Sequence, residues 1–156
     1  MLGNAKKDKC RVEIENLIPK SVCPYGGDKC SFNGIYSPKV KNFKFLALSN
    51  FWEAYDYTQR LYNVNLDNNL PLFNQTTYTL CNEKYSNLKS LNDKNKVGVS
   101  KNRLAKLCVE NVYIIHLLDL LGFKTYQDLD FVEKINDKQT SWALGYLLFL
   151  LNNNQL

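Results

Sequence analysis

The chain has 156 residues, and its hydrophobic content of 45% is enough to bury one core of ordinary size. Its formal net charge of +5 comes from scattered lysines interrupted by Asp and Asn, a pattern typical of a solvated surface rather than of a nucleic-acid-binding face. The longest apolar run, residues 142–151, falls short of the roughly 20 residues that span a bilayer, so we expect no transmembrane segment in this chain.

The first half of the chain predicts helices and strands in alternation. Apolar residues at helical spacing indicate a short helix over residues 10–18, which a proline ends. Residues 30–38 alternate like a strand, and residues 44–49 are typical of a buried strand. Residues 49–64 then predict an amphipathic helix, and residues 70–82 a second one.

The second half is more helical. Residues 83–99 are rich in Lys and Asn and predict a surface loop, whereas residues 102–121 predict the longest and most deeply buried helix. Residues 126–135 predict a short helical turn followed by a strand, and Asp137 is the expected cap of a last helix over residues 138–153. The expected fold class is therefore α/β, mostly helical with a few short strands.

The cysteines and one sequon favour the secretory pathway. Five cysteines are many for a reduced cytosolic protein of this size, and "NQT" beginning at Asn74 is a glycosylation sequon. Six residues separate Cys23 from Cys30, which does not fit a redox motif, and a zinc site would need a second close pair. A structural disulfide between these two cysteines fits best, and we expect no metal site in this chain. An odd number of cysteines also leaves one over.

Several short motifs follow one another in a distinctive order. They are "SVCPY" at residues 21–25, "CSFNGIYSP" at 30–38, "RLAKLC" at 103–108, "YIIHLLDLLGF" at 113–123 and "SWALGY" at 141–146. Together these motifs resemble the nucleoside triphosphate diphosphohydrolases, or apyrases, of the GDA1/CD39 group. The resemblance covers nearly the whole of this chain but only the C-terminal third or so of such an enzyme.

The resemblance implies a fold and a division of the chain. Enzymes of this group resemble actin, with two RNase H-like lobes around a cleft. By resemblance, residues 1–136 form the end of the second lobe and residues 137–156 a C-terminal helix that packs back on the first lobe. The missing N-terminal portion would then be a partner of this chain.

The resemblance also implies an activity that this chain cannot perform alone. The family hydrolyses nucleoside tri- and diphosphates with Ca²⁺ or Mg²⁺, phosphate-binding loops and a glutamate that activates water. In the family those loops and that glutamate lie upstream, and no D-x-G-S or G-G-A-S loop occurs in this sequence. We therefore expect this chain by itself to be inactive and to bind no cation.

The same resemblance assigns the cysteines. It pairs Cys23 with Cys30 and Cys81 with Cys108, and it pairs Cys10 with a cysteine that this chain does not contain. These disulfides, together with glycosylation at Asn74, imply a location outside the cell or in the lumen of the secretory pathway.

Recognition of the nucleobase is the one functional role that the resemblance places here. Family members stack the base between aromatic rings, and an arginine lies near the nucleoside in some of them. Trp52, Tyr55 and Arg103 are the candidate nucleotide-binding residues in this sequence, whereas Glu53 and Leu107 occupy the positions where the family has its rings. The alternative function is a stand-alone secreted module that binds a nucleoside or another protein without catalysis.

Overall fold

The computed structural model describes residues 6–18, 22–27, 29–37, 43–123, 129–139 and 142–153, without the side chains of Trp142 and Leu144. Most of the described residues are helical. The helices are α1 (Lys7–Leu17), α2 (Asn50–Tyr62), α3 (Leu70–Asn82), α4 (Tyr85–Lys94), α5 (Lys101–Leu120) and α6 (Trp142–Asn152). The other elements are the 3-10 turn η1 (Phe32–Gly34) and the strands β1 (Phe45–Ala47) and β2 (Leu129–Phe131).

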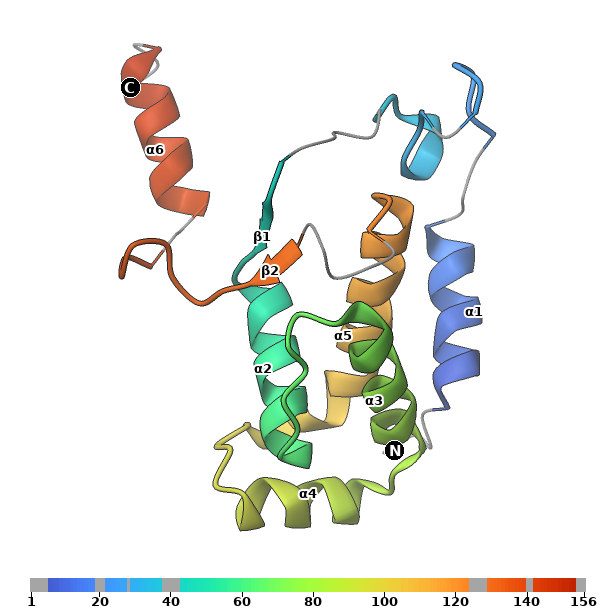
Figure 1. Cartoon of the computed structure of the whole chain (residues 1–156), viewed down its shortest axis with the longest axis vertical. Helices are drawn as coiled ribbons and strands as arrows, with labels where there is room; N and C mark the ends of the chain where they lie inside the picture. Colours follow the sequence, from blue (N-terminus) through green and yellow to red (C-terminus); the bar gives the residue numbers. More distant parts are fainter. Residues whose placement is uncertain are drawn as a thin grey trace.

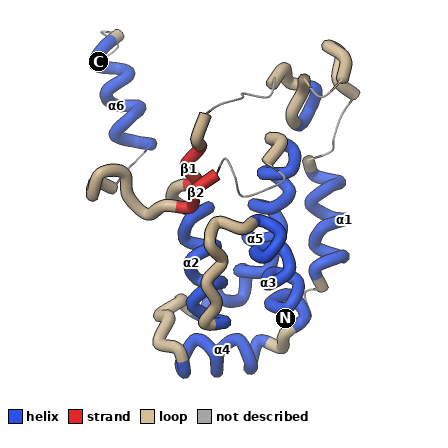
Figure 2. Tube along the Cα trace, viewed as in Figure 1, coloured by secondary structure: helices blue, strands red, loops and turns tan. Residues whose placement is uncertain are grey.

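Helix α5 is the centre of a helical body that also includes α1, α2, α3 and α4. It contacts each of these four helices, and α4 crosses one end of the body (Figure 1). Helix α6 stands apart from this body, beyond the strands (Figures 1 and 2). The chain therefore folds as one packed body with a separate C-terminal helix.

The two strands form a small parallel sheet at the edge of the body. Leu46 of β1 pairs with Asp130 of β2, and all of α2 to α5 lies between the two strands in sequence. This connection follows the β-helix-β logic that parallel strands require. The strands predicted within residues 44–49 and 126–135 are confirmed, and the helical turn predicted before β2 lies outside the described residues.

The core is built from apolar positions that recur at helical spacing. Phe73, Leu61 and Leu107, from three different helices, are each 0% exposed. Burying a side chain of this size contributes roughly 1.5–3 kcal/mol. Asn111, also 0% exposed, lies among them and donates hydrogen bonds to the hydroxyls of Thr58 (2.8 Å) and Thr77 (3.3 Å), which joins α5 to α2 and α3.

Two predicted helices have clear physical ends. Helix α3 has the predicted bounds, and the Asn69 side chain accepts from the Leu72 N–H at 2.9 Å at its start. Helix α5 ends at Leu120, Gly122 follows with a φ of 93° that suits glycine, and the Phe123 N–H bonds to the Leu118 carbonyl at 2.8 Å. The apolar run in α5 is only partly buried, because Tyr113 is 43% exposed.

The surface loop predicted for residues 83–99 is wrong over much of its length, since residues 85–94 form α4. Tyr85, Leu88 and Leu91 lie three residues apart and pack against the core. Helix α4 packs on both α2 and α5. The Lys and Asn residues on the other face obscured this narrow apolar stripe in the sequence.

Two further predictions from the sequence, a strand over residues 30–38 and a helix cap at Asp137, are also wrong. Asn33 and Gly34 have φ values of 58° and 70°, so the alternating segment makes the turn η1 instead of a strand, with a single bridge between Cys30 and Tyr36. Asp137 has φ 61° and lies in a turn, and α6 begins only at Trp142, so Asp137 does not cap that helix.

Candidate functional site

A pocket of about 450 Å³ lies between the start of α2 and the first half of α5. Its walls combine rings, aliphatic groups and charges. The side chains that matter most here are Phe51, Arg103, Lys106, Glu110, Tyr113 and Ile114. A pocket of this size with apolar walls and a few polar groups is typical of a small-molecule site.

Arg103 is held in this pocket by groups from two helices. Its Nη1 pairs with the carboxylate of Glu53 on α2. Its guanidinium also lies over the ring of Tyr57, 5.1 Å from the ring centroid, at a distance suited to a cation–π contact. These contacts fix the plane of the guanidinium before any ligand arrives.

The third neighbour of Arg103 is Glu110, which lies on the same helix. The Nε of Arg103 lies 3.4 Å from Oε2 of Glu110, and both atoms are buried without a hydrogen bond in the described chain. At this distance the two atoms form an ion pair, and their burial keeps both of them out of contact with a ligand. The Glu110 carboxylate thus adds a third contact that holds the Arg103 guanidinium in place.

Helix α5 brings the polar residues of the pocket onto one face. Arg103, Lys106, Glu110 and Tyr113 follow one another at intervals of three, four and three residues, which places them on one side of a helix. Ser100 caps this helix by accepting from the Arg103 N–H at 3.4 Å. The spacing was a signal in the sequence that could have identified Lys106, Glu110 and Tyr113.

The rings at the pocket are not the ones that the sequence predicted. Trp52 is half-buried and packs against the core, and the residues lining the described pocket do not include it. Phe51, its neighbour, lines the pocket instead. Of the two positions where the family has rings, Glu53 pairs with Arg103 and Leu107 is fully buried.

Tyr55 lies in the core, with 4% of its surface exposed. Its ring stacks on Phe131 with centroids 4.1 Å apart, and its hydroxyl accepts a hydrogen bond from the Asn68 N–H at 2.7 Å. Burial raises the pKa of Tyr55 to about 12. These contacts make Tyr55 a packing residue that ties α2 to β2.

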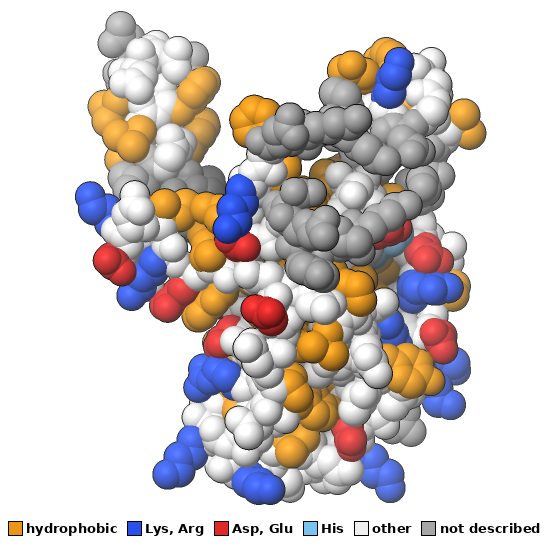
Figure 3. Space-filling model, viewed as in Figure 1, with side chains coloured by type: hydrophobic (Ala, Val, Ile, Leu, Met, Phe, Trp, Pro, Cys, Tyr) orange, Lys and Arg blue, Asp and Glu red, His pale blue; other side chains and the backbone are white. Residues whose placement is uncertain are grey.

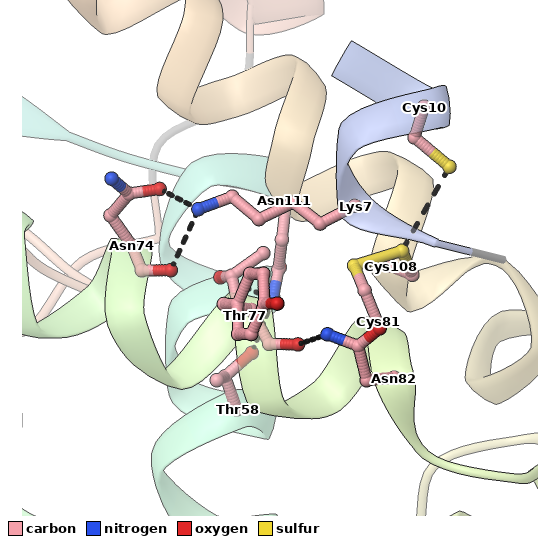
Figure 4. Close-up of a disulfide and its surroundings, with 10 residues drawn as sticks. Lys7, Cys10, Thr58, Asn74, Thr77, Cys81, Asn82, Cys108 and Asn111 are labelled. Carbon is pink, nitrogen blue, oxygen red and sulfur yellow. Dashed lines mark hydrogen bonds between the residues drawn. A yellow bond between two sulfur atoms is a disulfide. The ribbon is translucent and has the colours of Figure 1, made fainter.

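The structure contains both disulfides, Cys23–Cys30 and Cys81–Cys108. Cys10 is free, and burial raises the pKa of its thiol. Asn74 is exposed on α3, and its side-chain oxygen and its backbone carbonyl accept hydrogen bonds from Lys7, as Figure 4 shows.

A divalent cation has no fitting donor set in the part of the chain that the structure describes. No three His, Cys, Asp or Glu side chains gather there in a way that could hold a metal ion. We therefore assign no cation-dependent step to these residues. No helix among the described residues has the length and apolarity needed to cross a membrane.

Comparison with known proteins shows the family. A model of the GDA1/CD39 (nucleoside phosphatase) family matches residues 1–156, and the chain therefore belongs to that family. It is 29% identical to ectonucleoside triphosphate diphosphohydrolase 2 of Rattus norvegicus over 96% of this chain and 29% of that protein.

Two other relatives align in the same way. Ectonucleoside triphosphate diphosphohydrolase 3 of Homo sapiens is 27% identical over 96% of this chain and 27% of its own length. Ectonucleoside triphosphate diphosphohydrolase 1 of Rattus norvegicus is 27% identical over 96% of this chain and 28% of its own length. The chain thus spans less than a third of the length of the curated relatives it matches.

Proposed function

We propose that this chain is the C-terminal part of a nucleoside tri- and diphosphate hydrolase and that the Arg103 pocket contacts the nucleobase. The family match over residues 1–156 supports the nucleotidase class, and the greater length of the relatives fits a longer protein, whose further portion the resemblance places upstream. The observation that carries the proposal is the guanidinium of Arg103, held in place between Glu53 and Tyr57 in a pocket with aromatic walls.

A nucleobase suits this pocket for a physical reason. Each base has a π-face that stacks on a planar cation or a ring, and its edge carries donors and acceptors. Arg103, Phe51 and Tyr113 supply the planar surfaces, while the ammonium group of Lys106, which also lines the pocket, supplies a hydrogen-bond donor for the edge of the base. The role that Trp52 had in the sequence-based proposal passes to Phe51, and Tyr55 supports the pocket only through the core.

The chemical step belongs, in this proposal, to the upstream portion. The phosphate-binding loops, the glutamate that activates water and any Ca²⁺ or Mg²⁺ are expected there, and the chain alone is expected to be inactive. The whole enzyme would have two actin-like lobes, with residues 1–136 closing the second lobe. The helix in residues 137–156 would pack on the first lobe, which fits the separate position of α6.

A location outside the cell or in the secretory lumen fits the same proposal. The relatives are named ectonucleoside triphosphate diphosphohydrolases, and the chain has two disulfides and an exposed sequon asparagine, Asn74. We propose that Asn74 carries a glycan and that Cys10 pairs with a cysteine of the upstream portion.

Substitution of Arg103 in the full-length protein tests the base contact. We expect Arg103→Ala to raise KM for ATP and ADP about tenfold, because a stacked cation contributes roughly 1–2 kcal/mol. Hydrolysis of inorganic triphosphate, which has no base, should stay unchanged. Arg103→Lys keeps the charge but loses the planar face, so its KM should lie between those of the wild type and Arg103→Ala.

The matched control is Arg11→Ala, which removes an exposed arginine of α1 outside the pocket. Equal loss of activity toward ATP and inorganic triphosphate in Arg103→Ala would show a folding defect or a phosphate contact and would contradict the base site. A native protein of only 18.1 kDa, without upstream peptides, would contradict the enzyme proposal and favour a nucleoside-binding module.

A further inference from the structure

The contacts of Arg103 cover most of its guanidinium and leave one surface for a ligand. Nη1 pairs with the carboxylate of Glu53, and Nε lies 3.4 Å from Oε2 of Glu110. The ring of Tyr57 lies against one face of the guanidinium, with its centroid 5.1 Å from Cζ. Glu53 and Tyr57 are four residues apart on α2, so one face of that helix supplies both contacts.

The edges of the guanidinium are closed to phosphate. An arginine holds a phosphate best through two parallel N–H groups, either Nε with Nη2 or Nη1 with Nη2. Glu110 occupies the first of these edges and Glu53 the second. Because Nε and Oε2 of Glu110 are fully buried, an anion does not reach the first edge from the pocket. Two-point binding of a phosphate at Arg103 is therefore blocked on both edges.

The charges at the pocket act in the same direction. Arg103 and Lys106 are positive, and the carboxylates of Glu53 and Glu110 balance them, so an anion gains little Coulomb energy here. A planar ring gains stacking and cation–π energy on a free face of the guanidinium. Arg103 lines the pocket and its side chain is 25% exposed. Since Tyr57 covers one face, the surface left for a ligand is the opposite face.

We propose that Glu53 makes Arg103 a stacking surface for the base and keeps phosphate groups away from it. The base lies on the face of the guanidinium opposite Tyr57, while Glu110 closes the buried edge. Glu53 is thus a specificity-determining residue, because it decides which end of a nucleotide this pocket accepts. The inference rests on the proposed nucleotide site and adds a reason why the phosphates point away from it.

Sulfate inhibition of the full-length protein tests the role of Glu53. Sulfate resembles phosphate in shape and charge but is neither substrate nor product. Glu53→Ala opens the Nη1–Nη2 edge and leaves an excess positive charge at the pocket. We expect sulfate to compete with ATP about tenfold more strongly in this variant than in the wild type, because bidentate hydrogen bonds between charged groups are strong. Sulfate inhibition of inorganic triphosphate hydrolysis, which does not use the base pocket, should be the same in both proteins.

Further variants separate the causes of this gain. Glu53→Gln removes the charge but keeps an amide oxygen at the edge, so its sulfate inhibition should lie between those of the wild type and Glu53→Ala. Combining Glu53→Ala with Arg103→Ala should abolish the gain, because the edge itself is gone. The matched control is Asp56→Ala, which removes another carboxylate of α2 that pairs with Arg60 outside the pocket. Its sulfate inhibition should equal that of the wild type.

The outcomes distinguish this inference from the base site on which it rests. Wild-type sulfate inhibition in both Glu53 variants, an equal gain with inorganic triphosphate, or a gain that persists without Arg103 would each overturn the role of Glu53. If Arg103→Ala raises KM for ATP while both Glu53 variants keep wild-type sulfate inhibition, the base site holds and only the role of Glu53 falls. If Arg103→Ala does not raise that KM, the base site falls and this inference falls with it. Should Glu53→Ala fail to fold, Glu53→Gln carries the same test.

Discussion

Helices α5 and α6 are both strongly apolar, yet only α5 buries its apolar residues. Leu104, Leu107 and Leu118 of α5 are each at most 3% exposed. In α6, Leu148 and Phe149 are 52% and 55% exposed, and Figure 3 shows hydrophobic side chains over the separate helix. The difference teaches that an apolar helix needs a partner to be buried. That partner has to come from the fold or from outside this chain.

The exposed face of α6 is what the proposed upstream portion would cover. Contiguous exposed apolar surface on a helix is costly in water and marks a site of interaction. The helices of the body, α1 to α5, cover one another, although Val12 and Leu17 of α1 remain exposed. The predictions below contrast the two regions, beginning with the largest expected effect.

Hydrogen exchange should separate the two helices most strongly. In the 156-residue chain, amides of α5 should exchange at least about a thousandfold more slowly than those of α6, because α5 opens only with the core. Mass spectrometry of peptides from each helix measures this ratio. In a full-length protein the α6 amides should become protected, and equal exchange in both helices of the short chain would break the comparison.

Leucine truncation should cost stability in the body alone. Leu107→Ala should lower the free energy of unfolding by about 3 kcal/mol, because the site is 0% exposed and a cavity remains. Leu148→Ala in α6 is the matched control and should change it by less than about 0.5 kcal/mol. Denaturant unfolding measures both, and a similar loss in the two variants would mean that α6 is packed in solution.

The buried amide of Asn111 should contribute less than the leucine. Asn111→Ala removes the hydrogen bonds to Thr58 and Thr77 and should lower the free energy of unfolding by about 2 kcal/mol. Asn87→Ala, at an exposed site in α4, is the control for helix propensity and should leave stability nearly unchanged. Equal values for the two variants would contradict a stabilising role for the polar contacts in the core.

Tyr55 should make the stability of the body depend weakly on alkaline pH. Its pKa is raised from 10.0 to about 12 on folding, so between these values the unfolded chain loses a proton that the folded chain keeps. The contribution of Tyr55 to stability is therefore complete below pH 10 and is lost as the pH rises toward 12, by on the order of 1–2 kcal/mol. Unfolding curves at several pH values should show a shallower decline in Tyr55→Phe, and an unchanged slope would contradict this effect.

The site was predictable only in part, and Arg103 illustrates why. The sequence contains its motif and predicts its helix. The helical spacing of Lys106, Glu110 and Tyr113 could have identified one wall of the pocket. Its pairing with Glu53, a residue 50 positions away on another helix, had no local signal. That Phe51 lines the pocket and Trp52 does not also had no local signal, since neighbouring residues on α2 have different surroundings.

The sequence by itself determined the helical character of the chain, the bounds of α3, the glycine end of α5 and the family. These features depend on local periodicity, capping residues and motif order, which the chain carries without its tertiary contacts. Only the tertiary structure decided that residues 85–94 form a helix and that Tyr55 is a core residue. It also decided that Cys10 contacts a disulfide 98 residues away, because such contacts depend on how distant segments pack.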